Sequence, residues 1–251
     1  MTTATTVTPT QREPELLGQT VVVIGGSAGI GLETARRARA EGAEVILTAR
    51  NPERLERAAR ELGARSTAAF DAGDFDRLER FFKEELPGPV DHILLTGGGP
   101  YYAPLAEMDF AQARRSVDDH LWLNLHLARN AIGRVHPGGS LLFMGGTGGR
   151  RASYGGLVAA MTAMGPALVA GLAVEVAPIR VNLIAAGFVD TPLSASLLGD
   201  QLDARREELR TTLPIRRVVG PDDVAALAVH LMANTALTGA TYDIDGGQQL
   251  V

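Results

Sequence analysis

The stretch from Val21 to Arg50 constrains the fold more than any other part of the chain. Val21–Ile24 is a run of β-branched residues, apolar on both faces, which is typical of a buried parallel strand. A glycine-rich turn follows at 25–31, and a helical pattern over 32–41 then ends at a glycine. A second apolar strand over 45–49 completes the unit. The stretch therefore predicts a strand–turn–helix–strand unit with both strands in one parallel sheet.

The glycine-rich turn is suited to binding phosphate. A backbone without Cβ atoms can approach a pyrophosphate closely, and the free N–H groups at the positive end of the following helix face it. Such a turn alone is weak evidence, but inside a βαβ unit of this length it is strong evidence for a dinucleotide site. We expect the following residues of the turn to bind the cofactor: Gly25, Ser27, Ala28, Gly29, Ile30 and Gly31.

The end of the second strand indicates which dinucleotide binds. In such a unit this position, roughly 20 residues past the glycines, meets the adenosine ribose. An acidic residue there would accept hydrogen bonds from the ribose hydroxyls of NAD and repel a 2′-phosphate. This chain instead has Ala49 followed by Arg50, whose guanidinium matches phosphate. The sequence therefore predicts NADP; the alternative is that Arg50 is a solvated arginine in an arginine-rich chain.

Length and composition fit one large α/β domain. The chain has 251 residues, 45% of them hydrophobic, a formal net charge of −5 and no cysteine. The acidic balance argues against nucleic acid, and no basic amphipathic helix is available for a membrane surface. Residues 1–14 are polar and threonine-rich without an apolar core, so we expect a loose tail rather than a signal peptide, and a cytoplasmic protein. Residues 15–251 are expected to form the domain.

Strand-like and helix-like patterns alternate along the rest of the chain. The turn that starts at Gly97 follows a strand at its carboxyl end, where open α/β sheets bind ligands. The alternation predicts a single-domain α/β fold of Rossmann type, with a doubly wound parallel sheet and helices on both faces. The further expected strands are 66–70, 91–96, 140–144, 180–185 and 241–244, and the expected helices are 74–86, 109–135, 156–173, 191–213 and 221–232.

One uncharged segment, from Ala152 to Val174, is long enough to span a bilayer. It consists mostly of small residues, contains Gly165-Pro166 and runs into a strand, so a buried globular helix is the better interpretation. Residues 156–173 show no polar stripe, which indicates that another subunit covers much of the helix. We therefore expect a homo-oligomer, a dimer or tetramer; the alternative is that the polar segment 191–213 folds over the helix.

Taken together, these residues resemble the short-chain dehydrogenase/reductase family over nearly the whole chain, from Gly18 to Gly247. The glycines of the phosphate turn match the family's pattern, and Asp245-Gly246-Gly247 looks like its C-terminal signature. The resemblance implies a dimer or tetramer. It also implies roles for residues beyond the glycine turn, with Asp71 and Ala72 meeting the adenine ring and Val189 and Thr191, in the loop 186–191, holding the nicotinamide carboxamide.

The catalytic pattern of the family is missing. Its members use a Tyr general acid helped by a Lys one helical turn further on, with a Ser upstream and an Asn on the preceding helix. A phenol of pKa about 10 exchanges protons poorly near neutral pH unless a cation lowers that pKa. Lys83 is the only lysine, and no Tyr lies four residues before it. The four family positions fall on Val158 for Tyr, Thr162 for Lys, Gly145 or Gly146 for Ser, and His120 for Asn.

Two residues are weak candidates for a replacement proton donor. His120 lies one helical turn from Asn124 and titrates near neutral pH, although a histidine packed on a helix surface is the more common situation. Tyr154 lies about one turn before the lost Tyr position. The hydroxyls of Tyr101 and Tyr102 could line the pocket and act there, but tyrosines in such places more often only pack with their rings and keep the hydroxyl at the polar side. No residue pattern suggests a metal site.

Two functions remain open. The first is an NADP(H)-dependent oxidoreductase with an atypical site, acting on an unknown small-molecule carbonyl or activated alkene; the second is a non-catalytic sensor that binds NADP(H) on the same scaffold. A non-redox enzyme is a third possibility, because fold does not fix chemistry. The nicotinamide-side loop favours the oxidoreductase, since a sensor that reads only adenosine would not need it.

Overall fold

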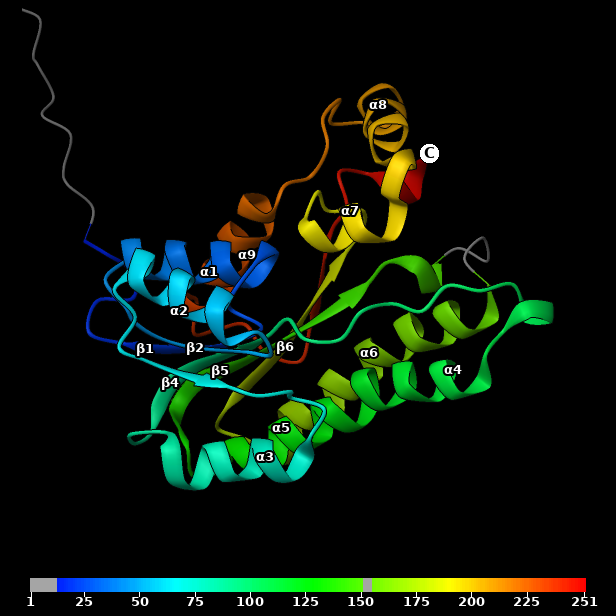
Figure 1. Cartoon of the computed structure of the whole chain (residues 1–251). Helices are drawn as coiled ribbons and strands as arrows, with labels where there is room; N and C mark the ends of the chain where they lie inside the picture. The colour runs from blue at the N-terminus through cyan, green and yellow to red at the C-terminus, as the bar shows by residue number, and fades with distance from the viewer. Residues whose placement is uncertain (1–12, 151–154) are drawn as a thin grey trace, which may run out of the picture.

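Seven parallel strands form one sheet at the centre of the molecule (Figure 1). The computed structural model describes residues 13–150 and 155–251. The strand order is β3-β2-β1-β4-β5-β6-β7. From β1, the strands β2 and β3 extend toward one edge of the sheet, and β4 to β7 extend toward the other. The strands are β1 Thr20–Ile24, β2 Glu44–Ala49, β3 Ser66–Ala69, β4 Val90–Leu95, β5 Val135–Gly146, β6 Arg180–Ala186 and β7 Thr241–Ile244.

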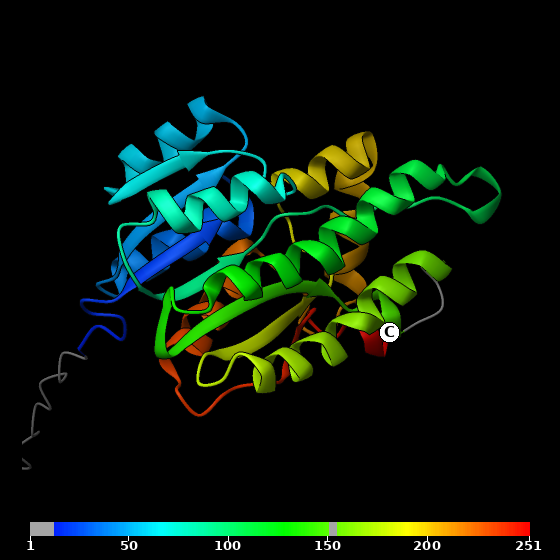
Figure 2. The ribbon, with the colours of Figure 1, turned by 90° about the horizontal axis from the view of Figure 1, so that it is seen from below.

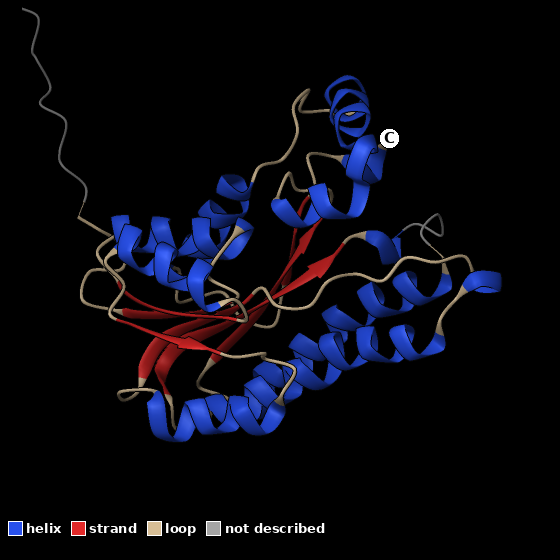
Figure 3. Cartoon of the chain, in the orientation of Figure 1, coloured by secondary structure: helices blue, strands red, loops and turns tan. Residues whose placement is uncertain are grey.

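Helices cover both faces of this sheet, as the alternating pattern predicts (Figure 3). One face carries α1, α2 and α9, and the other carries α3, α5 and α6, which lie in front of the sheet in Figure 2. The fold is therefore the predicted doubly wound, single-domain Rossmann type. The helices are α1 Gly29–Ala40, α2 Pro52–Leu62, α3 Phe75–Arg80, α4 Phe110–Val117, α5 Leu123–Ala131, α6 Gly156–Glu175, α7 Pro192–Leu198, α8 Leu202–Thr212 and α9 Pro221–Ala233.

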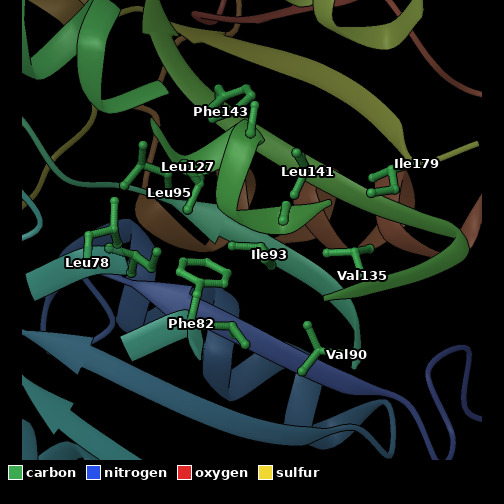
Figure 4. Close-up of a cluster of buried hydrophobic side chains, with 14 of the residues drawn as sticks. Leu78, Phe82, Val90, Ile93, Leu95, Leu127, Val135, Leu141, Phe143 and Ile179 are labelled. Atoms are coloured by element: carbon green, nitrogen blue, oxygen red, sulfur yellow. The ribbon is translucent and has the colours of Figure 1, made fainter. Parts of the chain in front are cut away.

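The β1 strand divides its side chains between two hydrophobic cores. Val21 and Val23 pack under α1, α2 and α9, whereas Val22 and Ile24 pack on the opposite face. This explains why the strand is apolar at every position, because successive side chains of a strand point to opposite faces. The second core also holds Phe82, Leu127 and Phe143, whose side chains meet between the sheet and its helices in Figure 4.

The single helix expected over 109–135 is interrupted. A π-helical turn at Asp118–Trp122 separates α4 from α5, and the side-chain amide of Asn124 donates to the carbonyl of His120 within it (2.9 Å). Residues 132–134 form a turn, and the last residue of the expected helix, Val135, begins β5, whose pairing with β4 shifts register beside Val90. The apolar spacing runs through the π turn without marking the buried side, since Phe110 is 71% and Ile132 is 60% exposed, so the spacing could not reveal the break.

The apolar helix α6 is largely uncovered within this chain. Only Val158, Val169 and Leu172 are buried, and Val174 is 79% exposed, so the interpretation as a buried globular helix was wrong for the single chain. The helix packs on β5, β6 and the turn at Gly148–Arg150. The segment expected as one helix over 191–213 forms α7 and α8, which stand above the carboxyl ends of the strands (Figure 1).

Candidate functional site

The glycine-rich turn packs tightly against the end of β4. Gly25 has φ +94°, and a Cβ atom there would lie 2.4 Å from Oγ1 of Thr96. A Cβ at Gly31 would lie 2.3 Å from the carbonyl oxygen of Gly25. The Thr96 hydroxyl donates to the carbonyls of Ile24 (3.1 Å) and Gly25 (3.3 Å). Glycine is therefore required at both positions to hold α1 against the strand ends.

The N-terminus of α1 is left open to a ligand. Its N-cap residue, Ala28, makes no side-chain capping bond, and the first turn has no acidic residue. In contrast, α2, α3 and α4 have the N-cap residues Asn51, Asp74 and Asp109, and the side chain of each accepts a backbone N–H of its helix. The first N–H groups of a helix need an acceptor, and this twelve-residue helix presents them at the glycine turn. The turn at 25–31 thus fits a pyrophosphate.

Arg50 lies at the carboxyl end of β2 with its side chain exposed. Among residues 13–150 and 155–251 it makes no hydrogen bond or ion pair, although its charge acts on Asp119. The next residue, Asn51, is occupied by capping α2 through the N–H of Arg54 (2.8 Å). The guanidinium is therefore available to a phosphate at the position where the adenosine ribose is expected.

Asp71 and Ala72 lie beside Arg50, because β3 pairs with β2 through Ala49 and Ala69. The carboxylate of Asp71 accepts the N–H of Gly73 (3.0 Å), which fixes the turn that leads into α3. Ala72 is partly buried against the core under α3 and α5. The structure thus places both predicted adenine-side residues at the strand edge that holds Arg50.

Sequence reasoning missed Asp119, which lies in the π-helical turn and reaches the same edge. A Cβ at Gly98 would lie 3.3 Å from Cβ of Asp119, and a Cβ at Gly73 would lie 3.6 Å from its Oδ1. Burial raises the pKa of the Asp119 carboxyl, and the charge of Asp71 adds to this rise, while His120 and Arg50 oppose it. No local motif marks this residue, since its neighbours come from other strands.

The loop after β6 contains the two residues expected on the nicotinamide side. Val189 forms a parallel bridge with Val219, and Thr191 caps α7 by accepting the N–H of Ser194 (3.3 Å). A Cβ at Gly29 would lie 3.5 Å from the Cβ and Cγ2 atoms of Thr191. The glycine turn and the loop expected on the nicotinamide side therefore lie in contact.

Three further contacts hold this loop in place. Asp190 accepts two hydrogen bonds from the guanidinium of Arg206 on α8, at 2.8 and 2.9 Å, and this pairing raises the pKa of Arg206. A Cβ at Gly187 would lie 2.6 Å from Cβ of Asp245, so the C-terminal segment presses directly on the loop. Gln248 accepts the N–H of Phe188 (2.8 Å). The loop is supported from both sides.

The positions that match the family's catalytic residues lie together but carry other side chains. Val158 is buried, and the hydroxyl of Thr162 donates to its carbonyl (2.8 Å). A Cβ at Gly146 would lie 3.1 Å from Cγ2 of Thr162. The only lysine, Lys83, forms an ion pair with Glu79 on the helical segment that follows β3. A hydroxyl engaged by its own helix cannot replace the missing ammonium group.

The glycines at the end of β5 and in the turn after it leave room for the side chains of α6 and β6. A Cβ at Gly149 would lie 2.7 Å from Oγ1 of Thr162, and one at Gly145 would lie 3.1 Å from the side chain of Leu183. These contacts favour packing as the reason for the glycines. A cavity of about 210 Å³ remains there, lined by Gly146, Gly149, Arg150, Thr162, Ala163, Pro166, Ala185 and Thr241.

The candidate proton donors differ in how they are placed. The Nδ1–H of His120 donates to the carbonyl of Ser116 (2.7 Å), because a carbonyl can only accept, and this leaves Nε2 for another partner. Tyr154 lies outside the described residues. The hydroxyl of Tyr101 accepts the N–H of Asp109 (2.9 Å) and so supports the start of α4. The described residues contain no group of three or more side chains suited to a metal ion.

Comparisons with known families, sequences and solved structures find similar proteins over most of the chain. The family model described as enoyl-(acyl carrier protein) reductase matches residues 25–249. The short-chain dehydrogenase/reductase ATR9 of Stachybotrys chlorohalonatus (strain IBT 40285) is 30% identical, over 93% of this chain and 98% of its own. The cyclic-di-GMP-binding biofilm dispersal mediator protein of Escherichia coli (strain K12) is 28% identical, over 91% and 96%. The crystal structure of BdcA in complex with NADPH aligns with a TM-score of 0.82 at 26% identity, over 93% and 95%.

Proposed function

The chain is a member of the short-chain dehydrogenase/reductase family, and on that premise we propose that it is an NADP(H)-dependent oxidoreductase of a small-molecule carbonyl or activated alkene. The observation that carries this proposal is the pairing of an uncapped helix at the glycine turn with an unpaired Arg50 at the end of β2. The solved structure of BdcA with NADPH, a similar chain, supports the choice of cofactor.

Different residues of the cleft would bind different parts of the cofactor. The glycine turn would hold the pyrophosphate on backbone N–H groups, and Arg50 would pair with the 2′-phosphate. Asp71 and Ala72 would face the adenine, and Thr191 with its loop would orient the nicotinamide ring. When bound, NADPH supplies the hydride for reduction. The work of the protein is then to orient the rings and to provide a proton.

We assign the proton donor to His120. With Nδ1 donating to the carbonyl of Ser116, the imidazolium form would carry its transferable proton on Nε2. The neutral ring left after transfer keeps the Nδ1–H bond, so the same tautomer accepts a proton from water in the next cycle. Reduction of an activated alkene depends less on the missing Tyr and Lys than ketone reduction does. This favours an alkene substrate.

One observation favours a second function, a non-catalytic NADP(H) sensor. The positions of the family's Tyr and Lys hold Val158, which is buried, and Thr162, whose hydroxyl bonds to its own helix. A similar protein is named a cyclic-di-GMP-binding biofilm dispersal mediator, which describes binding rather than turnover. A cleft that keeps the cofactor residues without these catalytic groups suits such a role.

Turnover separates the two functions. NADPH and NADH are titrated by fluorescence, and loss of NADPH absorbance is then followed with ketones, quinones and enoyl compounds. The oxidoreductase proposal expects turnover of at least one class, with a loss of 10²–10⁴-fold, the usual order of magnitude for an acid–base group, in His120→Ala. The exposed His136 provides the control, since His136→Ala should be unaffected. Binding without turnover of any acceptor would favour the sensor, and unaltered turnover in His120→Ala would remove this donor.

We further propose that the protein is a cytoplasmic homo-oligomer that binds neither nucleic acid nor membranes. By length and composition, α6 is the one helix of the described residues that could cross a bilayer. However, one side of α6 packs on β5 and β6 of the central sheet, and a helix packed in this way cannot also span a membrane. Its exposed apolar side is better covered by a second copy of the chain, which agrees with the frequent oligomers of this family.

A further inference from the structure

Asp119 is a half-buried carboxylate without a hydrogen-bond partner among residues 13–150 and 155–251. Such a group costs stability unless a donor reaches it, because carboxylate oxygens accept strong hydrogen bonds. The residues next to it in the chain are engaged differently, since His120 bonds to Ser116 and Asn124 bonds to His120. No donor from its own helical turn reaches Asp119, so its oxygens are open to a ligand.

The position of Asp119 identifies which part of a bound dinucleotide lies near it. Its Oδ1 and Oδ1 of Asp71 lie within 3.6 and 3.4 Å of the same point, the place that a Cβ of Gly73 would occupy. On its other side Asp119 contacts the turn at Gly98. It therefore stands between the turns after β3 and β4, where the charge of Arg50 also acts on it.

We propose that Asp119 is a specificity-determining residue of the adenine subsite and accepts a hydrogen bond from the 6-amino group of the base. This inference rests on the proposed function, because it assigns one further residue to the same cleft. An amino group offers two N–H donors, and the carboxylates of Asp71 and Asp119 both lie close to Gly73. Asp71 also binds the N–H of Gly73, whereas Asp119 has both oxygens available.

The arrangement discriminates between bases that differ at position 6. Adenine presents an amino donor there, whereas hypoxanthine presents a carbonyl oxygen. Two carboxylates attract the first and repel the second, and a buried acceptor without its donor is costly. The cleft therefore selects an amino purine through Asp119, in addition to selecting the 2′-phosphate through Arg50.

The test compares NADPH with nicotinamide hypoxanthine dinucleotide phosphate in its reduced form, in which a carbonyl oxygen replaces the 6-amino group of the base. Dissociation constants for both are measured by fluorescence on the full chain. The wild type is expected to prefer NADPH, and Asp119→Asn should reduce this preference about tenfold, the effect of one charge-assisted hydrogen bond. The Asn side chain of the first variant could still accept a hydrogen bond through its carbonyl oxygen. Asp119→Ala removes this acceptor and should also lose the preference for NADPH. Asp118→Asn removes the same charge one residue away and should keep the wild-type ratio.

The outcomes separate the two claims. If both Asp119 variants keep the wild-type preference, or if they weaken both nucleotides equally, Asp119 does not contact the 6-amino group. A wild-type protein that binds NADPH but shows no preference would contradict this inference and leave the proposed function intact. A wild-type protein that binds neither nucleotide would contradict the proposed function itself.

Discussion

The stability of this protein should fall in mild acid because of one buried histidine. His92 on β4 is 3% exposed, with Nδ1 2.9 Å from Oγ of Ser140 and Nε2 2.6 Å from Oε1 of Gln19. Burial lowers the pKa of His92 to about 3, and the guanidinium of Arg180 adds to the effect. His92 lies in the amino-terminal half of the central strand β4, whereas the cofactor cleft is expected at the carboxyl ends of the strands, so stability can be tested without disturbing binding.

The sign and size of this change in the free energy of unfolding follow from the pKa of His92 in the folded and unfolded states. An unfolded histidine has a pKa of about 6.5, so above that pH neither state binds the proton and the contribution of His92 is complete. Between pH 6.5 and about 3 only the unfolded state binds it, and the free energy of unfolding falls by about 1.4 kcal/mol per pH unit. Between pH 7.5 and 4.5 the loss due to His92 is therefore about 2.5 kcal/mol.

Urea unfolding at these two pH values, at one protein concentration, measures the effect. His92→Gln should lose about 2.5 kcal/mol less than the wild type on acidification, because carboxylates contribute equally to both proteins. The exposed His136 gives the control, and His136→Gln should follow the wild type. Equal acid losses in wild type and His92→Gln would refute the reasoning. Should His92→Gln fail to fold, an NMR titration of the wild type would decide, and a His92 ring that protonates near pH 6.5 would refute it.

Three further variants probe the fold, the cleft and the assembly. Gly31→Ala should weaken NADPH binding at least tenfold in a fluorescence titration, since its Cβ would lie 2.3 Å from the carbonyl oxygen of Gly25; unchanged binding would contradict the close packing of the turn. Arg180→Lys should lower the free energy of unfolding by about 2–4 kcal/mol in a urea titration, because the guanidinium donates five hydrogen bonds to backbone carbonyls that an ammonium cannot reach together. Val174→Glu, at an exposed position of α6, should shift the light-scattering mass toward the monomer, and an unchanged oligomer would place the interface elsewhere.

Local patterns allowed the sheet and the phosphate turn to be predicted. The β-branched run at 21–24 and the glycines after it depend on neighbours that are close in sequence, so the first βαβ unit was confirmed nearly residue by residue. The last strand, Thr241–Ile244, was also placed correctly because turns bound it on both sides. Alternation along the chain was enough to establish the doubly wound topology.

Features that depend on distant parts of the chain could not be predicted. The π-helical turn at Asp118–Trp122 lies within an apolar spacing that also fits a straight helix, so the local sequence does not mark it. Asp119 acquires its surroundings from the turns after β3 and β4, which lie more than twenty residues earlier. The exposure of α6 was partly foreseen from its missing polar stripe, yet composition alone could not show which residues stay uncovered.

The most direct test of the central claim is the ratio of the NADH and NADPH dissociation constants, measured by fluorescence for the wild type and for Arg50→Ala. We expect the wild type to prefer NADPH and Arg50→Ala to lose about tenfold or more of its NADPH affinity, while its NADH affinity stays nearly unchanged. Arg54→Ala, on the exposed side of α2, serves as the control. A wild type that binds neither nucleotide, or an Arg50→Ala variant that weakens both equally, would contradict the account.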